Sequence, residues 1–195
     1  MIIDVSSYQG KIDWQKVSHQ DITRVILRST VKNGNLDGRL MENYNGILQN
    51  MNEVLKAVDF YKFSYCRDYT GARMECKKTL EELIKHGIRL DVMDYFFLDL
   101  EAWGGRDYYT HEANEVIMAY ADECEKAGVR LGLYSNYNYL KNIIDPVWHN
   151  IPLWYARYNS YMGDIRPFKA LFWQYTSKGQ VEGIEGNVDI SREVE

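Results

Sequence analysis

Two acidic residues, Asp99 and Glu101, stand two positions apart where a short apolar run from Tyr95 to Leu100 ends. Side chains alternate between the two faces of a strand, so these acids would point to the same side with α-carbons about 6.6 Å apart. Like charges that close resist double ionisation, which keeps a proton on one carboxyl group near neutral pH. Acid-catalysed cleavage of a glycosidic bond needs such a group, so we predict a catalytic pair. A solvated strand terminus or a cation-binding loop is the competing structural explanation.

Two further acids lie at or near the ends of predicted strands. Asp4 is close to the end of the run 1–5, and Asp189 lies in the run 187–190. In a barrel of parallel strands, the loops at the carboxyl ends converge on one open face, where functional residues gather. Strands are depleted in aspartate, so acids at four such positions favour a single polar site. For Asp4 alone, a local turn or helix cap ahead of Ser6 and Ser7 is an alternative, and Asp189 alone has a similar one.

The elements that must position these acids alternate along the chain. Short runs rich in aromatic or β-branched residues predict eight strands, at 1–5, 24–29, 57–64, 95–100, 130–134, 153–157, 171–175 and 187–190. Such an alternation with helical stretches is typical of an α/β fold in which a parallel sheet is covered by helices. Eight strands suit closure into an irregular, TIM-like (β/α) barrel.

Three stretches, at 37–56, 70–86 and 107–127, carry apolar residues at three-to-four spacing and predict helices. Gly87 and Gly128 follow two of them as expected helix stops. After Ile144 the connections shorten, and 159–168 reads as a loop, so we expect a reduced set of helices late in the chain.

The composition excludes several classes of protein. A length of 195 residues with 46% hydrophobic and 26% charged residues is ordinary for one globular domain. No apolar run approaches the roughly 20 residues that span a bilayer. The net charge of -5 lacks clustered Lys or Arg, which argues against nucleic acid as a partner. The three cysteines lack metal or redox spacing, so we expect free thiols.

An ordered series of short motifs runs the length of the chain. They are DVSSYQG from Asp4, FLDLEAW from Phe97, LYSN from Leu133, LWYARY from Leu153, WQYTS from Trp173 and GNVDIS from Gly186. This series resembles the glycoside hydrolase family 25 muramidases, in matching order over essentially the whole chain. The resemblance implies a lysozyme that hydrolyses the β-1,4 bond between N-acetylmuramic acid and N-acetylglucosamine of bacterial peptidoglycan, on an eight-stranded barrel and without a cofactor or metal.

The resemblance also implies roles for the acids. Glu101 matches the general acid, and Asp99 matches the neighbouring carboxylate that stabilises positive charge or orients the acetamido group of the substrate. Asp4 and Asp189 match two further active-site acids that tune and position Glu101. Whether the configuration is retained through substrate assistance, retained through an Asp99 adduct or inverted depends on the carboxylate separation and the sugar pose.

The chain holds 16 tyrosines and 5 tryptophans, whose flat apolar rings with polar edges suit stacking on sugars. By resemblance, Tyr134, Trp154 and Trp173 would line the sugar groove, and Tyr61 is a plausible addition. Filling of the barrel interior is the alternative explanation, and it weighs most for Trp173, which stands inside a predicted strand.

The third predicted strand departs from the family pattern. Lys62 stands where many members carry histidine, and the usual glycine is missing near Ala57. A barrel lysine can form a Schiff base if burial lowers its pKa, although a solvated or salt-bridged lysine is the simpler explanation. The second strand follows a looser variant of the pattern, so we assign no role to Arg28.

Two other classes of protein compete with a hydrolase. A metal-dependent polysaccharide deacetylase needs histidine ligands at coordinating spacing, but His19, His86, His111 and His149 are scattered over predicted helices and loops. A non-catalytic glycan-binding domain would keep the groove without turnover, and the four acids argue against it.

These observations define the expected setting of the protein. We expect one catalytic domain over 1–195, acting as a monomer on bacterial peptidoglycan, with no nucleic-acid or membrane partner. The first residues show no basic patch, long apolar region or cleavage site of a signal peptide. We therefore expect release to the wall by lysis, through a holin-type pore or by another export route.

Overall fold

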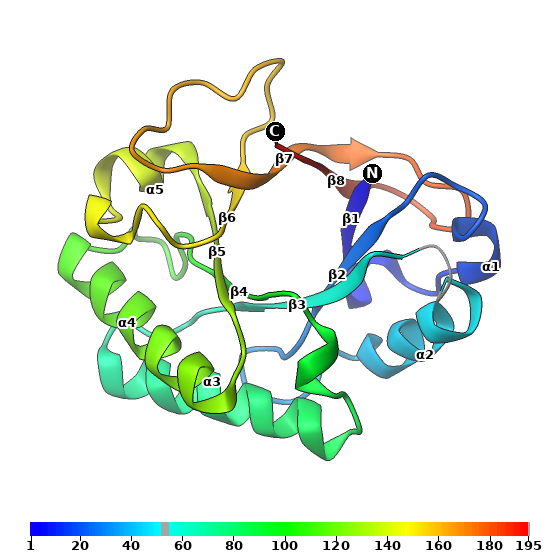
Figure 1. The fold of residues 1–195 in the computed structure, drawn as a ribbon, viewed down its shortest axis with the longest axis horizontal. Helices are drawn as coiled ribbons and strands as arrows, with labels where there is room; N and C mark the ends of the chain where they lie inside the picture. Colours follow the sequence, from blue (N-terminus) through cyan, green and yellow to red (C-terminus); the bar gives the residue numbers. More distant parts are fainter. Residues whose placement is uncertain (52–54, 195) are drawn as a thin grey trace.

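The structure, a computed structural model, describes residues 1–51 and 55–194 and contains one closed eight-stranded barrel (Figure 1). The strands follow one another around the barrel in chain order. They are β1 (Ile2–Val5), β2 (Arg24–Arg28), β3 (Ala57–Phe63), β4 (Phe96–Asp99), β5 (Leu131–Asn136), β6 (Leu153–Ala156), β7 (Ala170–Gly179) and β8 (Val188–Glu193). Each predicted strand is present, and the irregular barrel is confirmed.

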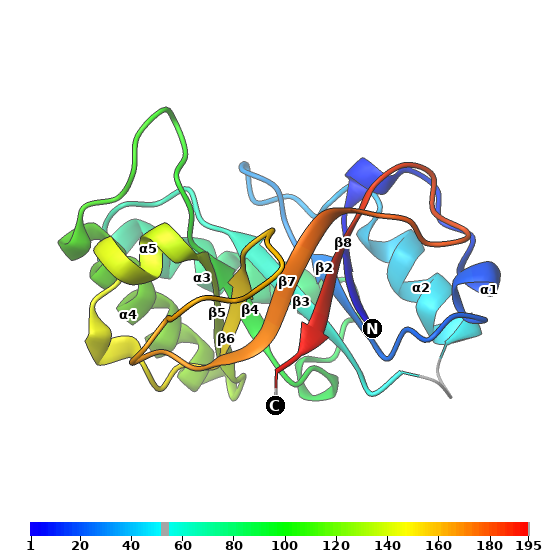
Figure 2. The same ribbon diagram turned by 90° about the horizontal axis from the view of Figure 1, so that it is seen from above.

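The direction of the last strand differs from the prediction. β1 to β7 are mutually parallel along the barrel, but β8 runs antiparallel to both β7 and β1. The expectation of a purely parallel sheet is therefore wrong for β8. Only the short segment 180–187 joins β7 to β8, and a parallel return needs a crossover of a dozen or more residues. Figure 2 shows the two long strands side by side.

Five α-helices and three short 3-10 helices lie among the described residues. They are α1 (Trp14–Val17), α2 (Leu40–Asn50), α3 (Tyr69–Lys85), α4 (Thr110–Ala127) and α5 (Tyr137–Asn142), with η1 (Ser7–Gln9), η2 (Leu90–Val92) and η3 (Pro146–Trp148). The helix predicted over 37–56 is shorter than expected, and 52–54 lie outside the described residues. Gly128 caps α4 with a φ of 69°, and Gly87 follows α3 with a φ of 82°, so both predicted stops are confirmed.

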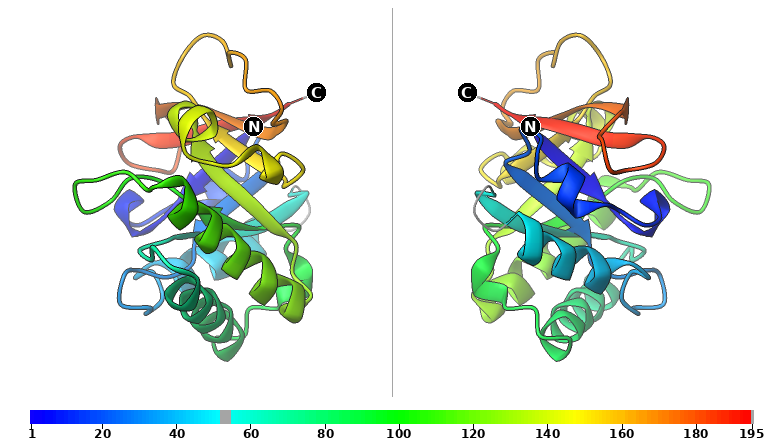
Figure 3. Two further views of the ribbon diagram at one scale, coloured as in Figure 1. Left: turned by 90° about the vertical axis from the view of Figure 1, so that its left-hand side faces the viewer. Right: turned by 90° about the vertical axis from the view of Figure 1, so that its right-hand side faces the viewer.

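The helices cover the barrel unevenly. Figure 3 shows α3 and α4 packed along one side, while no helix of the described residues crosses the β7–β8 ribbon on the opposite side. The segment 157–169, between β6 and β7, has no helix or strand, as the sequence predicts. None of the helices in the described residues is both long and apolar enough to cross a membrane.

Apolar side chains form two separate cores. The larger one lies between the barrel and its helices, and the smaller one fills the barrel interior. Within the interior, the ring of Phe97 occupies space that only a glycine leaves open, since a Cβ at Gly132 would lie 2.4 Å from Cε1 of Phe97. Full burial of such a ring stabilises the fold by about 1.5–3 kcal/mol. This apolar plug separates polar groups at the two ends of the barrel.

Candidate active site

A cavity of about 400 Å³ opens at the carboxyl ends of the parallel strands. It is lined by all the acids predicted to be catalytic, namely Asp4, Asp99, Glu101 and Asp189. Three predicted groove residues, Tyr61, Tyr134 and Trp154, line the same cavity. The antiparallel course of β8 explains the place of Asp189, because the first residues of β8 lie at this end and put Asp189 opposite Asp4.

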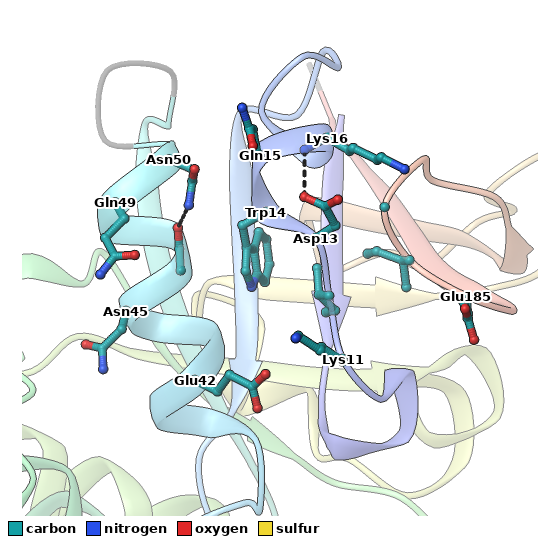
Figure 4. Close-up of a pocket in the computed structure, with 14 residues that line it drawn as sticks. Lys11, Asp13, Trp14, Gln15, Lys16, Glu42, Asn45, Gln49, Asn50 and Glu185 are labelled. Carbon is teal, nitrogen blue, oxygen red and sulfur yellow. Dashed lines mark hydrogen bonds between the residues drawn. The ribbon is translucent and has the colours of Figure 1, made fainter.

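Size alone does not mark this site. A larger hollow, of about 920 Å³, lies between α1 and α2 on the flank of the barrel (Figure 4). Its lining mixes acidic, basic and amide side chains, such as Glu42, Lys11 and Asn45. It contains none of the predicted catalytic residues, so we place the site in the smaller cavity on the grounds of chemistry.

Backbone hydrogen bonds explain why Asp99 and Glu101 share one face. β4 ends at Asp99, but Leu100 N still donates to Tyr134 O at 3.0 Å. Ser135 Oγ donates to Leu100 O at 2.8 Å, which holds this residue beside β5 as well. The extended alternation therefore continues beyond β4, and both carboxyl groups line the cavity, which is the shared orientation that the spacing predicts.

Glu101 is oriented by a side chain from the next strand. Asn136 Oδ1 accepts a hydrogen bond from Tyr139 N at 3.2 Å and so caps α5. That cap turns Asn136 Nδ2 toward Glu101 Oε1, at 3.4 Å. Burial and the charge of Asp189 raise the pKa of Glu101, while the Asn136 hydrogen bond lowers it in part. A helix cap therefore also places the predicted proton donor.

Asp99 lies at the end of β4 and lines the cavity. Its side chain is nearly buried, and Oδ1 has no hydrogen-bond partner among the described residues. Burial raises the pKa of Asp99 well above its ordinary value, and the charges of Glu101 and Asp4 raise it further. No hydrogen bond to this buried oxygen stabilises the carboxylate form, which agrees with the raised pKa of Asp99.

A glutamine that the sequence analysis missed organises the opposite wall. Gln174 Nε2 donates to Asp4 Oδ2 at 2.8 Å. Gln174 Oε1 accepts from the hydroxyls of Tyr134, at 2.9 Å, and Tyr158, at 2.8 Å. Burial and the charge of Asp189 raise the pKa of Asp4, and the Gln174 hydrogen bond opposes them. The sequence did contain a signal for Gln174, because it is a polar residue inside an apolar strand, two positions from Phe172.

Trp173 does not reach the cavity, contrary to the prediction. Its neighbours Phe172 and Gln174 point into the barrel, so strand alternation turns Trp173 outward. Its indole Nε1 donates to Arg157 O at 2.9 Å, and the guanidinium of Arg192 lies 4.5 Å from the ring centroid. Trp173 therefore supports the barrel wall from outside.

Trp154 and several further aromatic residues surround the acids. Trp154 is buried in the barrel, where its Nε1 donates to Ser191 Oγ at 3.0 Å and its ring lies 4.5 Å from that of Tyr134. Lining residues that the sequence analysis did not single out include Tyr8, Phe63, Tyr65 and Tyr158. The site is thus an acidic cavity with aromatic walls.

Arg28 is the one basic residue among the described residues that line the cavity. Its Nε donates to Asp37 Oδ2 at 2.7 Å, and its Nη2 donates to Ser7 Oγ at 2.8 Å. Arg28 is thus paired with Asp37 and not with any of the four acids. Its charge therefore does not remove the repulsion among them.

The alternative chemistries lack support from the geometry. Lys62 is fully buried on the outer side of β3, where Nζ donates to Val31 O at 3.2 Å and lies 3.7 Å from Glu75 Oε1. It does not line the acidic cavity. The four histidines are exposed, and no metal-binding group of three or more His, Cys, Asp or Glu occurs in 1–51 and 55–194.

A barrel with paired carboxyl groups and aromatic walls at the carboxyl ends of its strands defines a site of the glycosidase type. Comparison with known families agrees, since the model of glycosyl hydrolases family 25 matches residues 3–184. The chain belongs to this family, which confirms the resemblance seen in its motifs.

Individual relatives have low sequence identity to this chain. The autolytic lysozyme of Clostridium acetobutylicum is 26% identical over 188 residues, covering 96% of this chain and 54% of the relative. The modular autolysin LytC from Streptococcus pneumoniae, solved with a synthetic peptidoglycan ligand, superposes with a TM-score of 0.85 at 25% identity, over 97% of this chain and 45% of LytC. This chain thus spans about half the length of both proteins. The catalytic domain of endolysin ply40 from bacteriophage P40 of Listeria monocytogenes shares the fold, with a TM-score of 0.77 at 21% identity over 99% of this chain and 92% of that domain.

Proposed function

We propose that this protein is a peptidoglycan muramidase that hydrolyses the β-1,4 bond between N-acetylmuramic acid and N-acetylglucosamine in bacterial cell walls. The main support is the pair formed by Glu101 and Asp99, two carboxyl groups in one cavity whose pKa values are both raised by burial. Such a pair holds a proton near neutral pH, as glycosidic cleavage requires. The likeness to an autolytic lysozyme and to a peptidoglycan-bound autolysin agrees with this substrate.

In the proposed reaction, protonated Glu101 donates its proton to the glycosidic oxygen as the bond to the leaving sugar breaks. Positive charge develops on the sugar ring, and Asp99 stabilises it as a carboxylate. Asp99 lines the cavity in which the substrate would bind, and we also assign it to orient the acetamido group. A water molecule then completes hydrolysis, and NMR of the first-formed reducing sugar distinguishes retention from inversion.

The remaining acids help this pair to keep a proton, and aromatic residues of the cavity bind the sugar. The charge of Asp189 favours the protonated form of Glu101. Asp4, held by Gln174, raises the pKa of Asp99, so the Glu101–Asp99 pair resists losing its last proton. We assign Tyr61 and Tyr134 to contacts with the sugar, because aromatic faces match the apolar faces of pyranose rings. Trp154 is buried and supports the ring of Tyr134 from inside the barrel.

Product analysis of digested peptidoglycan tests the proposal. New reducing ends on muramic acid are the expected result. Reducing ends on glucosamine, freed peptides, or binding without any product would overturn it, and the last outcome would indicate a glycan-binding domain.

We also propose that 1–195 form a single catalytic domain that acts as a monomer. The barrel closes on itself, because β8 pairs with β1 as well as with β7. Light scattering after size exclusion should give the monomer mass at concentrations where the enzyme is fully active.

A further inference from the structure

A second cavity lies directly behind one wall of the active site. It has a volume of about 590 Å³ and lies between the segment 32–34 and the exposed face of α3. Tyr65 lines both this cavity and the acidic one, so the two cavities adjoin at this side chain.

The two cavities carry opposite charge. The second is lined by four lysines and two glutamates, namely Lys32, Lys62, Lys77, Lys78, Glu75 and Glu81. Lys62 lies 3.7 Å from Glu75, and Lys77 lies 3.8 Å from Glu81. Within the described part of the chain, Lys32 and Lys78 form no ion pair, so two positive charges are available to an anion.

These two ammonium groups are held at the mouth of the cavity. Lys78 Nζ donates to Asn33 O at 3.1 Å across the gap. The Lys78 side chain passes close to Gly34, whose φ of 79° favours glycine at this position. Lys32 Nζ lies 4.8 Å from the ring centroid of Trp103 and 5.7 Å from that of Tyr65.

The walls of the cavity are apolar. Met74, which is exposed, and Cys66 contribute to the lining, and Tyr65 stacks edge-on against Trp103 with centroids 5.6 Å apart. Apolar walls with ammonium groups at the mouth suit a short peptide that carries free carboxylates. A bare phosphate would use the charges but leave the apolar walls unoccupied.

We propose that this second cavity binds the carboxylate-bearing peptide substituent of the wall glycan and makes the enzyme prefer peptide-substituted strands. The inference rests on the proposed function, in which the scissile bond belongs to the muramic acid that carries the peptide. The substituent must then project from the acidic cavity, and Tyr65 is the wall beyond which the basic cavity opens.

The test compares two forms of purified peptidoglycan, both stripped of phosphate polymers, one with its peptides and one after their removal by an amidase. The kcat/KM on the peptide-bearing form is divided by the kcat/KM on the peptide-free form. This ratio is measured for wild type and Lys32→Glu, with Lys169→Glu as a control on a remote exposed loop. We expect Lys32→Glu to lower this ratio about three- to fivefold, and added salt to reduce the difference. Lys169→Glu should leave the ratio at its wild-type value.

An unchanged ratio in Lys32→Glu, an equal loss in Lys169→Glu, or an effect that appears only with phosphate polymers present would overturn the inference. Co-sedimentation of the same variants with the two forms measures peptide recognition without turnover. If wild type releases no reducing ends from either form, the proposed function fails, while the co-sedimentation result still decides the inference. Melting curves verify that Lys32→Glu is folded.

Discussion

The two ends of the barrel interior both bury acidic side chains but treat them in opposite ways. At the amino-terminal end, Arg24 forms ion pairs with Asp59 and Asp94, and Asp59 also accepts a hydrogen bond from Tyr95 N at 2.9 Å. At the carboxyl end, none of the four cavity acids forms an ion pair with the described residues. One end neutralises its acids, and the other leaves them to repel one another.

This difference separates a structural group from a functional one. Burial raises the pKa of Asp59 to about 6, but Arg24 opposes that shift and favours the charged form. Burial also raises the pKa values of Asp4 and Asp99, and there neighbouring carboxylates raise them further, although the charge of Lys62 lowers that of Asp99 in part. A buried acid with a cationic partner contributes to folding, whereas one without such a partner retains a proton that chemistry can use.

The largest expected effect is at the carboxyl end. Glu101→Gln removes the proton donor, and we expect kcat to fall about a thousandfold, because a positioned acid contributes about 10²–10⁴ in rate. The variant should still bind peptidoglycan. Glu125→Gln, on the exposed side of α4, is the control and should retain wild-type kcat. Retention of substantial activity by Glu101→Gln would show that Glu101 is not the donor.

At the opposite end, Arg24→Met should reduce stability without changing the chemistry. Loss of the cation leaves Asp59 buried and uncompensated, which costs about 3–5 kcal/mol in the free energy of unfolding. Urea unfolding measures the loss, and kcat well below the melting temperature should stay close to wild type. The control is Lys56→Met, which breaks an exposed pair with Glu193 and should cost less than about 1 kcal/mol. Equal losses in both variants would contradict the comparison.

Asp99→Asn should stabilise the fold while lowering activity. The folded-state pKa of Asp99 is raised above the unfolded value, so its favourable contribution is present in acid and is lost as pH rises through the folded pKa. Asparagine avoids this loss, and we expect a gain on the order of 1 kcal/mol at neutral pH that disappears in acid. Urea unfolding at both pH values measures it. A variant that is less stable than wild type at neutral pH would refute the assigned cause.

Asp189→Asn is expected to have the smallest effect, on the pH profile. Asp189 raises the pKa of Glu101, so removal of its charge lets Glu101 lose its proton at lower pH. The alkaline limb of kcat/KM should therefore move to lower pH, while Asp21→Asn, at an exposed position, should leave it in place. An alkaline limb that moves to higher pH would be inconsistent with this coupling.

Much of the site followed from local alternation. The two-residue spacing of Asp99 and Glu101 predicted a common face, because the pleat of a strand is a local property. The same rule holds at Trp173, but the prediction assigned the inner face to the wrong residue. In a strand, an error of one position exchanges the inner and outer faces. Aromatic character drew attention to Trp173, although Gln174 is the residue that faces the acids.

Other features depend on partners that lie far away in the chain. Gln174 contacts Asp4 across 170 positions, and no local pattern reveals that pair. Lys62 finds Glu75 on α3, which distinguishes a buried structural lysine from a reactive one. The antiparallel course of β8 depends on how the last ribbon closes against β1.

The barrel strands and the shared face of Asp99 and Glu101 were predictable, since these depend on periodicity and residue type over a few positions. Which acids are neutralised and which keep a proton was not predictable in this way. That outcome depends on the distance to charges and on burial, and both are set by residues that folding brings together from distant parts of the chain.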